Sequence, residues 1–147
     1  MGDGEKTFDE ATEACQELSE KAFLVEPRTE GITNIANTYA NANDKLVTLW
    51  IGLTDKSTEG TFVWETDGEA LSYMNWAHRQ PNNWKGAQEC AAIIKRDGAW
   101  GDMKCGSPHH YLCQAKSGKM SSHQRCQIVN KTIVGLFNIS SLFILAQ

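Results

Sequence analysis

The spacing of the cysteines constrains this chain more than any other feature of its sequence. Of the five cysteines, Cys15, Cys90, Cys105 and Cys113 lie in the first part of the chain, and Cys126 is left over. No two of them have the Cys-x-x-Cys spacing of a zinc site or a thioredoxin-like motif. Four cysteines allow three pairings, and the turn-rich stretch between Cys90 and Cys105 favours a bridge that closes a hairpin there. The alternative is four reduced, buried thiols.

Length and charge divide the chain into a body and a tail. A chain of 147 residues fits one domain with one hydrophobic core. All 18 acidic residues lie within residues 1–113, whereas the four charged residues of 114–147 are all basic. We therefore expect an acidic folded domain over 1–115 and a different kind of segment over 116–147. An acidic body argues against a nucleic-acid partner.

The apolar periodicity predicts helices first and strands afterwards. Thr7 and Glu10 form a capping-box pattern before apolar residues at helical spacing, which predicts a helix over about 8–21. A second helix is expected to begin at Thr29 and to end within 41–44. The period then changes, and short apolar runs predict strands at 46–53, 61–64, 90–95, 99–105 and 110–115. This order indicates an α+β fold.

Two segments lie outside this pattern. Residues 65–88 are polar and rich in Asn, Gly and Trp, and a loop this long in a compact domain is usually functional. The tail ends in apolar runs at 133–137 and 142–145, which allow either a membrane-associating signal or an unrelated, loosely packed extension. We favour the second, because polar residues interrupt the run and it is shorter than a span. The first residues lack the apolar region of a signal peptide, so we expect a piece of a longer protein.

Several motifs, taken in order, resemble those of a C-type lectin domain over residues 6–115. They are Trp50-Ile51-Gly52-Leu53, Asn75-Trp76, Gln80-Pro81-Asn82, Cys90, Trp100-Gly101-Asp102, Cys105 and Tyr111-Leu112-Cys113. The resemblance implies two helices flanking small antiparallel sheets, with a long loop region that carries calcium and sugar. It also implies disulfides between Cys15 and Cys113 and between Cys90 and Cys105. The family's opening strand is missing, so we expect the strand at 110–115 to have an exposed edge.

The resemblance implies a degenerate principal calcium and sugar site on the Pro-centred loop. Pro81 would be the family's cis proline. Only one of the matching ligand positions is acidic, and a single carboxylate suits calcium poorly. Those positions are Gln80, Asn82, Gln88, Gly101 and Asp102.

The auxiliary calcium position of the family matches this sequence better than the principal one does, because three of its four matching residues are acidic. Those residues are Asp55, Glu59, Asn83 and Glu89, and we predict calcium there rather than at the principal site.

The pair of residues that binds the sugar in the family also differs in this sequence. Gln80 and Asn82 offer two neutral amides where sugar-binding relatives place one charged acceptor beside one amide. Trp84 can either stack on the apolar face of a sugar or pack down to order the loop.

The predicted function is a carbohydrate-binding lectin module assisted by calcium. The ligand would be a glycan of glycoproteins or microbial surfaces. The alternative is a lectin-like domain that binds a protein or another non-sugar ligand without calcium at the principal site. No sequence motif of an enzyme is present, so we expect a binding protein. The family and the disulfides indicate a secreted, extracellular protein.

Overall fold

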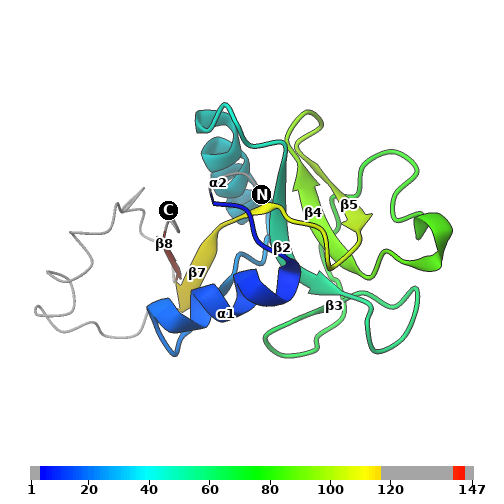
Figure 1. The fold of residues 1–147 in the computed structure, drawn as a ribbon, viewed down its shortest axis with the longest axis horizontal. Coiled ribbons are helices and arrows are strands. Elements are labelled where there is room, and N and C mark those ends of the chain that lie inside the picture. Colours follow the sequence, from blue (N-terminus) through cyan, green and yellow to red (C-terminus); the bar gives the residue numbers. More distant parts are fainter. Residues whose placement is uncertain (1–3, 117–140, 145–147) are drawn as a thin grey trace, which may run out of the picture.

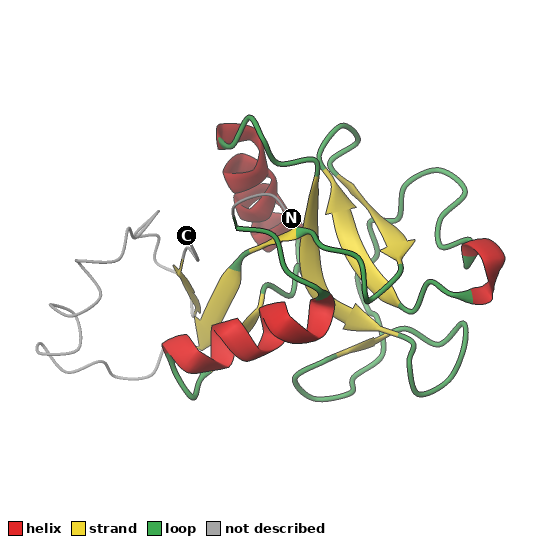
Figure 2. Ribbon diagram, viewed as in Figure 1, coloured by secondary structure: helices red, strands yellow, loops and turns green. Residues whose placement is uncertain are grey.

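The computed structural model describes residues 4–116 and 141–144 (Figure 1). Two helices lie toward one end of the molecule, and the long loop region projects at the other end with a short 3-10 helix at its tip (Figure 2). The elements in chain order are α1 Phe8–Leu18, β1 Ala22–Leu24, α2 Glu30–Ala42, β2 Thr48–Thr54, β3 Val63–Trp64, η1 Trp84–Gly86, β4 Cys90–Ile94, β5 Ala99–Met103, β6 His110–Tyr111, β7 Cys113–Lys116 and β8 Ser141–Ile144.

The N-terminal caps of both helices confirm what the sequence predicts. The Thr7 hydroxyl accepts from the Glu10 amide, and the Glu10 carboxylate accepts from the Thr7 amide at 3.0 Å. Thr29 caps α2 in the same position by accepting from the Ile32 amide. The predicted end of the first helix at 21 is wrong, because Ser19 is extended and residues 22–24 pair with β7 instead.

The larger sheet has the strand order β3-β2-β4-β5, and β6 pairs parallel with β2. Its centre is β2, six of whose seven residues are buried. That burial on both faces explains the continuous apolar run in the sequence. Antiparallel β4 and β5 form the hairpin that carries Asp102 toward the loop region.

The smaller sheet, of order β1-β7-β8, corrects two expectations. The strand predicted over 110–115 is divided at Leu112, so that β6 joins the larger sheet and β7 the smaller one. The predicted exposed edge is wrong, because residues 141–144 of the tail form β8 and pair antiparallel with β7 (Figure 1). Lys116 is the last residue of β7. Cys126 and the apolar run at 133–137 lie outside the described residues.

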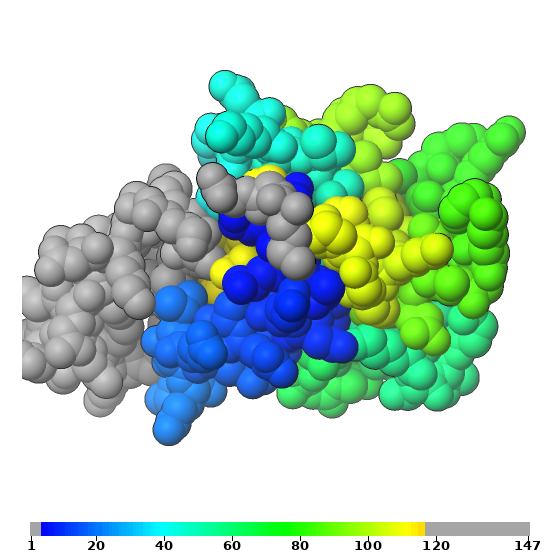
Figure 3. Space-filling view, in the orientation of Figure 1, coloured from blue at the N-terminus to red at the C-terminus, as the bar shows by residue number. Residues whose placement is uncertain are grey.

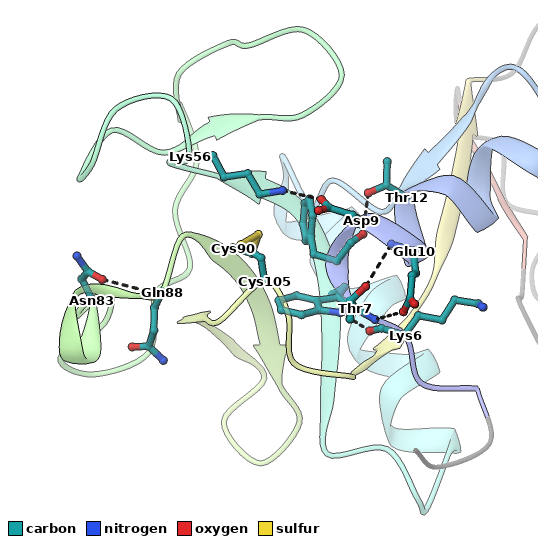
Figure 4. Close-up of a disulfide and its surroundings, with 12 residues drawn as sticks. Lys6, Thr7, Asp9, Glu10, Thr12, Lys56, Asn83, Gln88, Cys90 and Cys105 are labelled. Atoms are coloured by element: carbon teal, nitrogen blue, oxygen red, sulfur yellow. Dashed lines mark hydrogen bonds and ion pairs between the residues drawn. A yellow bond between two sulfur atoms is a disulfide. The ribbon is translucent and has the colours of Figure 1, made fainter.

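Both implied disulfides are present. Cys15 of α1 is bonded to Cys113 of β7, 98 residues along the chain. Cys90 and Cys105 close the β4–β5 hairpin, as Figure 4 shows. The alternative of four reduced thiols is therefore wrong.

Two clusters of buried side chains make the core. Trp64 and Trp100 belong to the cluster under α2, and Trp50 belongs to the one under α1. Three of the four tryptophans expected in the core are buried, and Trp76 is partly buried against it. Within residues 4–116 and 141–144, no helix is both long and apolar enough to cross a membrane.

Candidate functional site

The base of the long loop is fixed to the core by aromatic rings. Tyr73 and Trp76 meet Trp100 edge to face, with ring centroids 5.8 and 5.7 Å away. The Trp100 amide donates to the Asn75 carbonyl at 2.7 Å, and the Trp100 carbonyl accepts from the Ala77 amide. The segment that follows, residues 78–88, is therefore presented from a rigid base. Its atoms, coloured green, lie at one end of the molecule, on the right in Figure 3.

Asp102 holds this segment in place. Its side chain is 1% exposed, and the Asn82 amide donates to both of its carboxylate oxygens at 3.1 Å. The Asn83 amide donates to the same carboxylate. The peptide bond between Gln80 and Pro81 is cis, as the resemblance implies. The one acidic residue of the principal site thus binds backbone donors of the loop in this structure.

The amide side chains of the loop are bound through their oxygens. Trp84 donates its backbone amide to Asn82 Oδ1 at 3.0 Å and to Gln88 Oε1 at 2.7 Å. The Gln88 amide donates to Asn83 Oδ1 at 3.1 Å, a contact drawn in Figure 4. Gln80 Oε1 accepts from the Asp102 amide at 3.4 Å. The oxygens that calcium would need are engaged by the protein's own N–H groups.

Gly101 leaves space that these contacts use. A Cβ at this position would lie 2.9 Å from Ile94 Cδ1 and 3.4 Å from Gln80 Cδ. The glycine therefore allows the side chain of Gln80 to lie close against β5. Close packing at position 101 therefore explains why a residue with a side-chain oxygen for calcium does not stand there.

Trp84 stands out from the loop surface. It is 57% exposed, and Lys85 Nζ lies 4.3 Å from the centroid of its ring. This exposure agrees with a contact role and does not agree with Trp84 packing down to order the loop. The loop is ordered instead by Asp102 and by the aromatic base.

The auxiliary position has one feature that fits a cation. Asp55 is 3% exposed, and its Oδ1 is buried without a hydrogen-bond partner, while Oδ2 accepts from the Gly60 amide at 2.8 Å. An unpaired buried carboxylate oxygen is costly unless an ion or a donor satisfies it. The Asp55 amide donates to the Glu89 carbonyl, so these two predicted ligands are adjacent in space.

The rest of the predicted calcium set is less well assembled. Among residues 4–116 and 141–144, no three acidic, histidine or cysteine side chains are grouped closely enough to hold a metal. Glu59 and Glu89 are exposed, and Asn83 uses its Oδ1 on Gln88. The structure therefore brings Asp55 and Glu89 together and does not draw Glu59 and Asn83 into one ligand sphere with them.

Sequence reasoning missed two features of the site. Gly60, with φ of 78°, supplies the amide that orients Asp55, and the glycine five residues after an aspartate is the signal for such a turn. Arg79, Asn83 and Lys85 have positive φ, which turns the loop sharply around Pro81 and Trp84. No sequence signal marks Arg79 or Lys85 for this conformation.

Comparisons with known proteins agree with this geometry. The family model for the lectin C-type domain matches residues 4–115. The α-N-acetylgalactosamine-specific lectin of Patiria pectinifera is 34% identical over 124 residues, which cover 74% of this chain and 68% of that protein.

Two solved structures are also similar. The C-type lectin CEL-I of Cucumaria echinata has a TM-score of 0.69 at 30% identity, covering 76% of this chain and 84% of that one. The cow carbohydrate-recognition domain of CD23, solved in the presence of a GlcNAc2Man3 oligosaccharide, has a TM-score of 0.65 at 30% identity, covering 76% and 81%. With its two disulfides, its cis proline and a family match over residues 4–115, this chain belongs to the C-type lectin domain family.

Proposed function

We propose that the domain is a glycan-binding module whose ligand surface is the loop from Gln80 to Gln88. The observation that carries the proposal is the exposed ring of Trp84, held on a loop that Asp102 and the aromatic base keep in one shape. An aromatic ring fixed in this way can stack on the apolar face of a sugar. Gln80, Asn82 and Gln88 surround it with amide groups that can bond hydroxyls.

Asp102 acts in this proposal by positioning the loop. Its two carboxylate oxygens bind the amides of Asn82 and Asn83, so it sets where the loop's side chains lie. The printed names of the relatives support a sugar ligand: one is specific for α-N-acetylgalactosamine, and another was solved in the presence of an oligosaccharide.

Calcium assists from the auxiliary position in this proposal. Asp55, with its unpaired buried oxygen, is the first ligand, and Glu59, Asn83 and Glu89 are the other candidates. A bound cation there supplies positive charge that neutralises the acidic residues at the base of the loop. We propose no ion at the principal site, where Asp102 is the only acidic residue among five positions and is satisfied by N–H donors.

The disulfides support a secreted, extracellular location, where glycans of glycoproteins or microbial surfaces are available as partners. A second candidate is a domain that binds a protein ligand without calcium at the principal site. The engaged amide oxygens favour it, because calcium-bridged sugar binding needs them free.

Retention on immobilised sugars tests the proposal. The chain should be retained on mannose, galactose or N-acetylgalactosamine resin, and chelator should weaken the retention without abolishing the fold. If the chain passes through all three resins with calcium and with chelator, the glycan-binding proposal is wrong and the protein-ligand candidate takes its place.

A further inference from the structure

The four amide side chains of the loop offer donors to an incoming ligand. Gln80, Asn82, Asn83 and Gln88 each use their side-chain oxygen to accept a backbone N–H. Their NH2 groups form no hydrogen bond with any residue that the structure describes. Since each NH2 group carries two donors and each side-chain oxygen already uses one of its two lone pairs, these amides offer more donors than acceptors.

The charged side chains of residues 70–88 likewise offer donors and no anionic acceptor. Residues 70–88 contain no acidic residue, although all 18 acidic residues of the chain lie within 1–113. Arg79 and Lys85 are exposed, and neither forms an ion pair with a carboxylate among the described residues. Lys85 lies over the ring of Trp84, so a cation and the aromatic surface are presented together.

Two acidic residues, Asp102 and Glu89, contact the loop or follow it in the chain, and neither forms an ion pair with Arg79 or Lys85. Asp102 is buried and bound to backbone amides, so it faces the protein rather than the ligand. Glu89 is exposed but lies at the base of the loop, where its carbonyl accepts from the Asp55 amide. The loop is therefore a locally positive, donor-rich surface on an acidic domain.

We infer that the loop binds saccharides that carry a negative charge, as a sulfate ester or a carboxylate, through Arg79, Lys85 and the amide NH2 groups of the loop. This inference rests on the proposed glycan-binding function. Bonds from charged donors to an anionic oxygen are stronger than those between neutral groups, and the planar guanidinium of arginine matches both sulfate and carboxylate. Trp84 contacts the sugar ring that bears the charge.

Binding of three matched probes to the full chain tests the inference. The probes are N-acetyllactosamine, its 3′-sulfated form and its 3′-sialylated form, measured by surface plasmon resonance at low and physiological salt. The variant is Arg79→Gln combined with Lys85→Gln. The control is Lys45→Gln combined with Lys104→Gln, which removes the same charge from exposed lysines outside the loop.

We expect at least one anionic probe to bind about tenfold more tightly than the neutral probe, with the preference reduced by salt. The loop double variant should lose that preference, while the control matches the unmodified chain. The two anionic probes distinguish sulfate from carboxylate.

Equal affinities for the neutral and anionic probes would overturn this inference and leave the proposed function standing. So would a preference that the control reduces as much as the loop variant. If none of the three probes binds, and none of the sugar resins retains the chain, the proposed function and this inference both fail.

Discussion

The backbone amide of Asn82 donates to both carboxylate oxygens of Asp102 at 3.1 Å. This contact joins the hairpin of β4 and β5 to the loop that carries Trp84. In the family resemblance, Asp102 holds an ion; here it is satisfied by the loop itself. Asp102 therefore fixes the position of the loop through the backbone amides of Asn82 and Asn83.

Replacing Asp102 should loosen the loop. Asp102→Ala leaves the amides of Asn82 and Asn83 without an acceptor, which costs about 1–3 kcal/mol of unfolding free energy. Hydrogen exchange should speed up at these two amides more than in β2, and urea unfolding should show the loss. Asp97→Ala, at the exposed turn between the same strands, is the control and should leave the loop amides unchanged. Unchanged exchange in Asp102→Ala would contradict the positioning role.

Calcium should stabilise the domain through Asp55. Adding calcium is expected to raise the melting temperature, because an ion that binds only the folded state stabilises it by mass action. Asp55→Asn keeps an acceptor for the Gly60 amide but removes the unpaired anionic oxygen, so the calcium shift should disappear. Asp44→Asn, an exposed aspartate outside the site, should keep the shift. A calcium shift of equal size in Asp55→Asn would place the ion elsewhere.

The two disulfides should differ in their contribution to stability. The Cys15–Cys113 bridge closes a sequence separation of 98 residues, and the Cys90–Cys105 bridge one of 15. The chain-entropy model gives about 4.7 kcal/mol for a loop near 100 residues and about 3 kcal/mol for one near 15. Replacing both cysteines of each pair by alanine and measuring urea unfolding compares them. An equal or larger loss for the Cys90–Cys105 pair would contradict this order.

Stability should fall in mildly acidic solution because of His109. Burial, the largest cause, holds the pKa of His109 below its usual 6.5, and its Nδ1 lies 2.6 Å from Thr48 Oγ1. Between the lowered pKa and 6.5 the unfolded chain binds more protons, so the unfolding free energy decreases as pH falls through this window. Glu26 has the opposite sign, since burial raises its pKa and its contribution is lost as pH rises.

Substituting His109 separates its effect on the pH dependence of stability from the effect of Glu26. His109→Gln should flatten the pH dependence of the unfolding free energy between pH about 8 and about 5, and His78→Gln, an exposed histidine, should not. If both variants keep the full slope, the titration of His109 does not control stability in this range.

Much of the fold could be predicted because local signals agree with the tertiary structure. The caps at Thr7 and Thr29, the buried run of β2 and the paired cysteines all have their expected roles. The division of the last strand at Leu112 was not predictable. It arises because the two halves of one apolar segment pair with strands of different sheets, β6 with β2 and β7 with β1. The pairing of β8 with β7 depends on a contact between segments whose local sequence does not encode it.

The loop could be located from the sequence, but its contacts could not. The motif around Pro81 identified the loop and its cis peptide bond, but the sequence left open whether Trp84 is exposed or packs down. It could not show that Asn82, Gln88 and Gln80 turn their oxygens inward, because each orientation is set by a backbone donor elsewhere in the fold. The charge of Arg79 and Lys85 was visible in the sequence, but only the structure could show that neither has an ion-pair partner among residues 4–116 and 141–144.

The central claim is that the ring of Trp84 contacts a saccharide. The most direct measurement compares Trp84→Ala with Met74→Ala on the resin or probe that the unmodified chain binds most tightly. Trp84 and Met74 are 57% and 64% exposed in the same loop region, so both variants remove exposed apolar surface. We expect Trp84→Ala to lose retention and Met74→Ala to keep it; retention of Trp84→Ala equal to that of the unmodified chain would contradict the contact between Trp84 and a saccharide.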